Sequence, residues 1–196
     1  MRPIAIGWSV AAALAASCFG FAQQKGPEVE AHLPAQAAAD VLRDVAKADG
    51  AFLAAGMLST SGYQADNLAT LLQYPTDTVV VLGLTGAQVR QAFERSVSLY
   101  PQPNFSFLQV SGFEISFDAG AAPNQRVRSV SAPGGRLEDS KVYNIAMPVS
   151  LARGAYGYFK IWNESKIVST VPDMTVEKAL AGKKYVETRP RWAAQS

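Results

Sequence analysis

Residues able to perform acid–base, nucleophilic or metal chemistry are scarce in this chain. Of its 196 residues, one is a histidine, His32, and one is a cysteine, Cys18. The sequence holds no HExxH or HxxxH pair, no GxSxG nucleophile motif and no GxxxxGK phosphate loop. A centre with two metal ions needs many oxygen and imidazole ligands. A chain with a single histidine is therefore not expected to build one.

Paired carboxylates are the remaining source of acid–base chemistry. The acidic residues considered for such a pair fall on a polar helix face, an alternating strand or a turn, and they are Glu94, Glu114, Asp118, Glu138 and Asp139. We interpret them as solvated charges. We interpret His32 in the same way, as a solvated residue of the N-terminal linker. No residue is therefore assigned a catalytic or metal-binding role, and no cofactor is expected.

The first residues resemble a signal peptide. Arg2 supplies a positive start, residues 4–21 form an apolar, Ala-rich run, and Gly20-Phe21-Ala22 has the small-x-small pattern of a cleavage site. This pattern predicts a signal peptide over residues 1–22 and export to the periplasm or the extracellular space. Two alternatives stay open: lipidation at Cys18 and an uncleaved segment that anchors the chain in a membrane.

Composition narrows the classes of partner. Loss of Arg2 with residues 1–22 would change the formal charge from +2 to +1, so nucleic acid is not an expected partner. The mature chain would contain no cysteine. A group of basic and aromatic residues lies near the C-terminus, namely Lys183, Lys184, Tyr185, Arg189, Arg191 and Trp192. We interpret this tail as a solvated chain end.

Hydrophobic periodicity predicts a mixed helix and strand domain. The expected helices are 33–48, a short one around 68–72, 87–99 and 173–180, and the expected strands are 51–55, 78–82, 113–117, 126–131 and 141–147. Residues 78–82 lack polar alternation, which is typical of a strand covered on both faces. Thr85 and Gln88 have the spacing of a capping box at the start of a helix. We expect a linker at 23–27, one domain at 28–185 and a tail at 186–196.

Three segments carry a resemblance to a known family. They are Leu84-Thr85-Gly86, the run from Phe107 to Gly112, and the run from Tyr143 to Pro148 followed by Gly154 and Gly157-Tyr158. In this order they resemble the C-terminal, substrate-recognition domain of the 5'-nucleotidase family. The resemblance implies an α+β fold, a four-layer α/β/β/α sandwich. It also implies a domain that holds a nucleotide base between two aromatic rings, whereas a separate calcineurin-like domain performs metal-dependent hydrolysis.

The family's base-binding positions are only partly kept. Tyr74 in Gln73-Tyr74-Pro75 matches one of the aromatic rings. Ser150 replaces the second ring, and Tyr156 replaces an acidic residue of the same motif. The loop over residues 54–59 lacks the family's asparagine and arginine. The residues predicted to contact a ligand are therefore Tyr74, Tyr156 and Arg153.

These observations predict an exported, non-catalytic binding or accessory module whose ligand is nucleoside-like or nucleotide-like. Two alternatives remain. The chain is the recognition subunit of a hydrolase completed by a separate metallophosphatase chain, or it is a structural cell-surface domain without a ligand.

Overall fold

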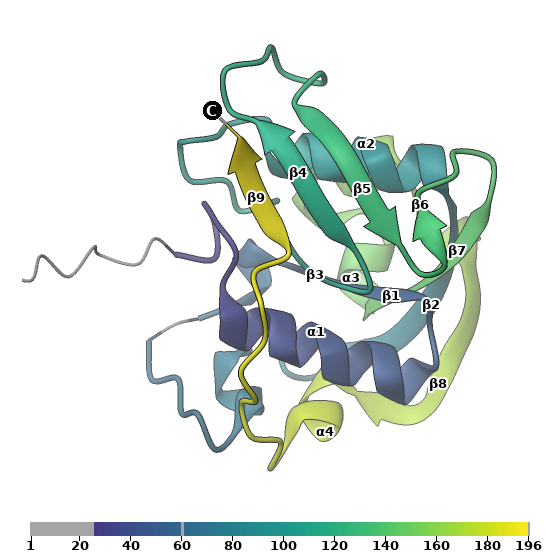
Figure 1. Cartoon of the computed structure of the whole chain (residues 1–196). Helices are drawn as coiled ribbons and strands as arrows, with labels where there is room; N and C mark the ends of the chain where they lie inside the picture. The colour runs from purple at the N-terminus through teal and green to yellow at the C-terminus, as the bar shows by residue number, and fades with distance from the viewer. Residues whose placement is uncertain (1–25, 60, 196) are drawn as a thin grey trace, which may run out of the picture.

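The computed structural model describes residues 26–59 and 61–195, which form helices and strands. Their strands form two sheets, one of five strands in the order β3-β1-β7-β2-β8 and one of four strands in the order β6-β5-β4-β9 (Figure 1). The mixed α+β class and the two sheets implied by the resemblance are confirmed. The predicted signal peptide (1–22), Cys18 and linker residues 23–25 lie outside the described residues.

All five predicted strands are present among the described residues, together with four strands that were not predicted. The five-stranded sheet contains β1 (Gly50–Ala54), β2 (Thr78–Thr85), β3 (Leu108–Ser111), β7 (Val142–Pro148) and β8 (Ile167–Thr175). The four-stranded sheet contains β4 (Glu114–Asp118), β5 (Val127–Ala132), β6 (Gly135–Arg136) and β9 (Trp192–Gln195). The helical elements are α1 (Leu33–Ala46), η1 (Ala55–Met57), η2 (Leu68–Leu71), α2 (Gly86–Ser96), α3 (Val149–Ala152), η3 (Ala155–Lys160), η4 (Glu164–Lys166) and α4 (Val176–Leu180).

The five-stranded sheet is covered on both faces. Alternate residues of β1 point to opposite sides: Leu53 packs in one apolar cluster with residues of α1 and α4, and Phe52 packs in the other with residues of α2 and the four-stranded sheet. In Figure 1, α1 lies next to α4, and α2 runs behind β4 and β5. The neighbouring strand β2 divides its residues in the same way, with Val79 in the first cluster and Val80 in the second. The prediction of a doubly covered strand is confirmed.

Helix α2 begins with the predicted capping box. The amide of Gln88 donates to Thr85 Oγ1 at 3.3 Å, and the amide of Thr85 donates to Gln88 Oε1 at 3.1 Å. The helix ends at Ser96, earlier than the predicted Leu99. The reason lies in Asn104, whose side-chain amide donates to the carbonyl oxygens of Arg95 and Ser96 at 3.0 and 2.8 Å. These bonds satisfy carbonyls that another helical turn would have used.

His32 is not a solvated linker residue, so that interpretation is wrong. It is the N-cap of α1, and its Nδ1 accepts a hydrogen bond from the amide of Ala35 at 3.3 Å. Its own amide donates to Gln109 Oε1 at 2.9 Å. Burial lowers the pKa of the imidazole, and the nearby carboxylate of Glu28 opposes this shift. The imidazole is thus a structural acceptor at the start of the helix.

The C-terminal residues are not a solvated chain end either. Strand β9 runs parallel to β4, and Trp192 is buried, with its indole nitrogen donating to the carbonyl of Leu108 at 2.8 Å. Arg191 forms an ion pair with Asp40 of α1 at 2.7 Å and donates to the carbonyl of Val110 at 2.8 Å. The segment after α4 therefore completes the four-stranded sheet.

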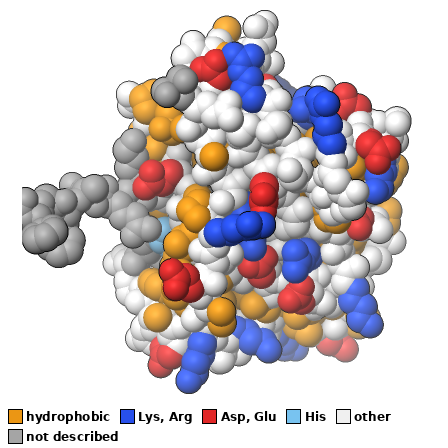
Figure 2. Space-filling view, viewed as in Figure 1, with side chains coloured by type: hydrophobic (Ala, Val, Ile, Leu, Met, Phe, Trp, Pro, Cys, Tyr) orange, Lys and Arg blue, Asp and Glu red, His pale blue; other side chains and the backbone are white. Residues whose placement is uncertain are grey.

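The surface carries charges of both signs. On the face shown in Figure 2, lysine and arginine side chains are interspersed with aspartate and glutamate. No helix within residues 26–59 and 61–195 has the length and hydropathy needed to cross a membrane.

Candidate functional site

Three loops meet at one edge of the five-stranded sheet. Strands β1 and β7 run parallel, so the segments that follow them, η1 and α3–η3, leave the sheet at the same edge. Strand β2 is antiparallel to β7, and it brings the loop that precedes it, residues 73–77, to this edge as well. The amide of Gln73 donates to the carbonyl of Met57 at 2.9 Å, which joins the first and third of these segments.

Tyr156 is the residue that links these loops. Its hydroxyl donates to the carbonyl oxygen of Gly56 at 2.7 Å. Its ring lies directly against the Gly56 backbone, because a Cβ atom at Gly56 would be only 2.3 Å from a carbon of that ring. Burial raises the pKa of the Tyr156 hydroxyl, and the neighbouring Tyr74 and Asp77 raise it further.

The backbone of Tyr156 adopts a conformation that is uncommon for a non-glycine residue. Its φ of 56° is in the left-handed region. Two nearby glycines also have left-handed backbones, Gly154 with a φ of 95° and Gly157 with a φ of 79°. The guanidinium of Arg95 fixes this turn, since both Nε, at 3.0 Å, and Nη2 donate to the Tyr156 carbonyl. A strained residue held by contacts at both its carbonyl and its hydroxyl is a rigid element of the site.

Ser150, at the position of the family's second aromatic ring, has a different role here. Its hydroxyl and its amide both donate to Oδ2 of Asp77, the amide at 3.2 Å. These bonds tie the start of α3 to the loop before β2. Asp77 was missed by sequence reasoning, because only the pairing of β2 with β7 brings it beside Ser150.

Tyr74 is one of three exposed aromatic residues in this region. The other two are Phe159 of η3, at 64% exposure, and Phe105, at 68%, whose carbonyl accepts the amide of Gly56 at 2.9 Å. The exposed fraction of Tyr74 is 51%, and its hydroxyl has no hydrogen-bond partner within the described part of the chain.

The neighbour of Tyr74, Gln73, bonds to Met57, and Tyr156 bonds to Gly56, so the loops that carry the two tyrosines meet at η1. The structure therefore brings together the loops of Tyr74 and Tyr156, with Asp77 and Gly56 beside them. We call these four residues and Ser150 the Tyr74–Tyr156 cluster.

Arg153 does not join this cluster. Its Nε lies 3.4 Å from Oε2 of Glu164, and both side chains are well exposed. Together with Asn163 and Ser165 they line an open pocket of about 690 Å³. The predicted ligand contact by Arg153 remains a prediction, and the structure places its guanidinium beside Glu164.

One of the acidic residues interpreted as solvated charges is in fact buried. Glu94 is 8% exposed, and its two carboxylate oxygens accept the amides of Arg126 and Val127 at 3.0 and 2.8 Å. It joins α2 to the start of β5. Three of the other carboxylates form ion pairs, namely Glu114 with Arg189, Asp118 with Arg128 and Asp139 with Arg90. Among the described residues, no group of three His, Cys, Asp or Glu side chains is placed to hold a metal ion.

Comparison with known proteins decides the family. The model of the family described as 5'-nucleotidase, C-terminal domain, matches residues 10–163. The chain belongs to this family. It is 33% identical over 96 residues to snake venom 5'-nucleotidase from Naja atra, and 33% identical over 107 residues to 5'-nucleotidase from Mus musculus. These matches cover 45% and 50% of this chain but only 18% of each relative.

Solved structures show the same fold. The crystal structure of a 5'-nucleotidase precursor from Thermus thermophilus superposes with a TM-score of 0.71 at 21% identity. The match covers 85% of this chain and 36% of that one. NAD nucleotidase from Haemophilus influenzae gives a TM-score of 0.62 at 17% identity, covering 85% of this chain and 34% of that one. The 5'-nucleotidase C-terminal fold therefore extends over most of this chain.

Proposed function

We propose that this chain is an exported binding or accessory module that holds a nucleoside-like ligand against Tyr74, without hydrolysing it. The observation that carries the proposal is the half-exposed ring of Tyr74, on a loop that bonds to the segment against which the Tyr156 ring is fixed. An exposed aromatic ring offers an apolar face on which a base can stack. Family membership supports the chemical class of the ligand, since the matched relatives are named as nucleotidases.

The composition of the cluster predicts weak binding. A base stacked on an aromatic ring gains about 1 to 3 kcal/mol. Ser150 supplies no second ring, and its hydroxyl is already bonded to Asp77. With one stacking face and few free polar groups, we expect dissociation constants on the order of 1 mM.

A thermal-shift screen with nucleosides, nucleotides and nucleotide sugars tests the proposal. Ligand at ten times its dissociation constant stabilises a protein by about 1.4 kcal/mol, which corresponds to roughly 3 to 5 °C for a chain of this size. Tyr74→Ala abolishes the shift, and Leu99→Ala, which removes a side chain of similar exposure elsewhere, preserves it. A chain that shows no shift with any of these compounds would support the structural alternative.

Export is a further part of this proposal. It is supported by the apolar run over residues 4–21 and by a relative found in snake venom. Mass spectrometry of the mature protein tests it: a chain beginning at Gln23 supports cleavage after Ala22. A lipid-modified Cys18 or an intact N-terminus would support the alternatives.

A second candidate function is recognition on behalf of a separate metallophosphatase chain. This chain spans 36% of the Thermus thermophilus 5'-nucleotidase that it matches. Phosphate release from a nucleotide, absent with either chain alone and present when both are mixed, would establish this function. Release by the purified chain alone with added Mn²⁺ would contradict both proposals.

A further inference from the structure

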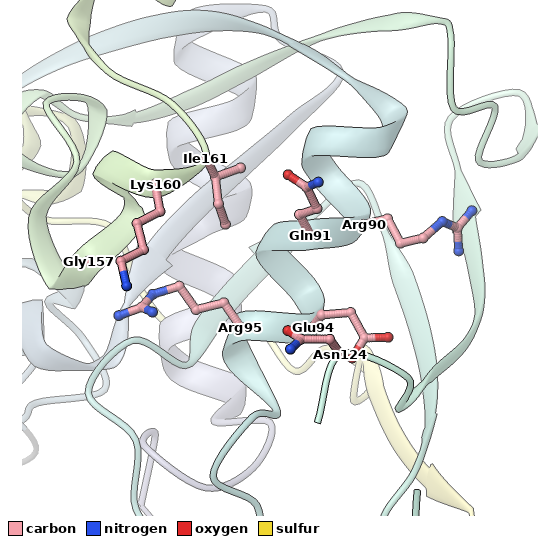
Figure 3. Close-up of a pocket in the computed structure, with 8 residues that line it drawn as sticks. All are labelled: Arg90, Gln91, Glu94, Arg95, Asn124, Gly157, Lys160 and Ile161. Carbon is pink, nitrogen blue, oxygen red and sulfur yellow. The ribbon is translucent and has the colours of Figure 1, made fainter. Parts of the chain in front are cut away.

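A second pocket, lined by none of the residues of the Tyr74–Tyr156 cluster, opens between α2 and η3. Its volume is about 520 Å³, within the usual range for small-molecule sites (Figure 3). Its polar lining residues are Arg90, Gln91, Glu94, Arg95, Asn124 and Lys160. Neither Tyr74 nor Tyr156 lines this pocket, although one of its residues, Arg95, bonds to the Tyr156 carbonyl. Phosphate binding here is therefore tested separately from nucleoside binding.

The pocket lining includes one carboxylate, that of Glu94. Both oxygens of Glu94 accept backbone amides at the start of β5, and the residue is 8% exposed. Arg90 forms an ion pair with Asp139 at 3.0 Å, and in Figure 3 its guanidinium points away from Arg95 and Lys160. The bonds from these neutral backbone amides leave Glu94 charged, but its side chain points away from the Arg95 guanidinium and Lys160 (Figure 3). An anion is therefore expected at the end of the pocket marked by Arg95 and Lys160.

Two cations at that end have no carboxylate partner among the described residues. Arg95 donates to the Tyr156 carbonyl and lies 5.4 Å from the centre of the Tyr158 ring, and both of these partners are uncharged. Lys160 is exposed and has no ion pair among residues 26–59 and 61–195. Figure 3 shows the Lys160 side chain extending toward the same end of the pocket as the Arg95 guanidinium.

The position of Arg95 is built into the fold. A Cβ atom at Gly157 would lie 2.2 Å from Arg95 Nη2, and the φ of Gly157 is 79°. A glycine with a left-handed backbone thus leaves room for the guanidinium. The guanidinium uses Nε and Nη2 on the Tyr156 carbonyl, so Nη1 remains for another acceptor.

Another arginine-rich pocket in the described part of the chain differs in the pairing of its cations. It measures about 460 Å³ and is lined by three arginines, each with a carboxylate partner: Arg43 with Asp44, Arg189 with Glu114 and Arg191 with Asp40. Its cations are already neutralised by the protein. In the pocket between α2 and η3, by contrast, Arg95 and Lys160 have no carboxylate partner among the described residues and can bind an external anion.

We propose that this pocket binds a small phosphorylated molecule, whose phosphate lies between Arg95 and Lys160. Guanidinium and ammonium groups are the usual partners of phosphate, and the amides of Gln91 and Asn124 provide additional donors. The volume exceeds that of a bare phosphate, so the remainder of the ligand also fits. The pocket is thus an anion site separate from the aromatic side chains of Tyr74 and Tyr156.

Titration followed by nuclear magnetic resonance tests this site on the full chain. The probes are inorganic phosphate, pyrophosphate and glycerol 3-phosphate, with glycerol as the neutral control. We expect saturable shifts of the Gly157 and Lys160 amides with the phosphates and none with glycerol. The variant Lys160→Gln weakens binding by about tenfold, as expected for a lost charge-assisted bond. The matched variant Lys166→Gln, on the exposed η4 element, leaves affinity within about twofold.

A second variant separates binding from folding. Gln91 is exposed on α2, so Gln91→Glu adds a negative charge to the pocket without disturbing the core. We expect it to weaken phosphate binding by about tenfold or more, whereas Gln125→Glu, also exposed, has little effect. The proposal is overturned if no probe gives saturable shifts up to about 50 mM, well beyond millimolar affinity. Equal weakening by the test and control variants would also overturn it.

Discussion

The hydroxyl of Tyr156 donates a hydrogen bond to the carbonyl oxygen of Gly56, 100 residues earlier in the chain. The ring lies so close that a methyl group on Gly56 would be 2.3 Å from it. This contact fixes the turn of η3 against the loop after β1. The residue before the exposed Tyr74, Gln73, bonds to Met57 in the same loop at 2.9 Å.

Replacement of Gly56 by alanine tests this contact. The added methyl group must displace the Tyr156 ring, and overpacking of this kind costs about 1 to 3 kcal/mol of unfolding free energy. In a Tyr156→Gly background the ring is absent, and the same replacement should cost less than about 0.5 kcal/mol. Gly120→Ala, whose Cβ would meet only an Asp118 oxygen at 3.4 Å, is the control. Equal costs of Gly56→Ala in both backgrounds, measured by chemical denaturation, would show that the ring is not what excludes the methyl group.

Ser150→Phe should strengthen nucleoside binding. It restores an aromatic side chain at the family's second ring position, and one stacked base is worth about 1 to 3 kcal/mol, or roughly 5- to 150-fold in affinity. Ser150→Ala removes the hydroxyl bond to Asp77 without adding a ring, and it should leave affinity nearly unchanged. Calorimetric titration of both variants provides the comparison. A phenylalanine that binds no better than the alanine would argue against stacking at this position.

Trp192→Ala should destabilise the whole domain. The indole ring packs on Phe107 and Phe93, with centroids 4.8 and 5.5 Å away, and its nitrogen bonds to Leu108. Truncation of a buried tryptophan costs about 3 to 5 kcal/mol of unfolding free energy. Val186→Ala, at an exposed position of the preceding segment, should change it by less than about 0.5 kcal/mol. A small effect of Trp192→Ala in urea denaturation would mean that β9 contributes little to the fold.

Stability should fall as the solution is acidified below the ordinary pKa of histidine. The folded-state pKa of His32 is lowered by burial, so the unfolded chain takes up a proton near pH 6.5 that the folded chain resists. The contribution of His32 is fully present above pH 6.5 and is lost as the pH falls through the lower, folded pKa. His32→Asn keeps an N-cap acceptor but cannot titrate in this range. Urea denaturation at about pH 7.5 and about pH 5.5, on either side of the ordinary histidine pKa, should show a larger loss for the natural chain than for this variant, and equal losses would remove His32 as the cause.

Local signals in the sequence predicted the elements that depend on local contacts. The capping box of Thr85 and Gln88 and the apolar run of β2 require only neighbouring residues, and both were confirmed. Strand β8 was missed although Ile167, Val168 and Val171 favour a strand, because the segment lacks a clear alternation and contains Pro172. Residues 173–175, predicted as the start of a helix, belong to this strand. Strand β9 was missed because it exists only by pairing with β4, more than 70 residues away. The pairing of Ser150 with Asp77 and the burial of Glu94 depend on the same long-range registers.

The candidate site was predictable to a similar extent. Family motifs pointed to Tyr74 and Tyr156, and the loops that carry them both bond to η1. Their contact with a ligand remains a prediction. The motifs could not show that Tyr156 is fixed by Gly56 and Arg95, because that contact arises from the left-handed turn of η3. Arg153, chosen from the same motif, pairs instead with Glu164.

Calorimetric titration of a nucleoside and of its free sugar shows whether Tyr74 holds a base by stacking. We expect the nucleoside to bind with a dissociation constant on the order of 1 mM and the sugar not to bind, because the base supplies the stacking energy. We expect at least about tenfold weaker binding by Tyr74→Ala and unchanged binding by Leu99→Ala. Equal affinity for nucleoside and sugar, or full affinity after loss of the Tyr74 ring, would contradict stacking on Tyr74.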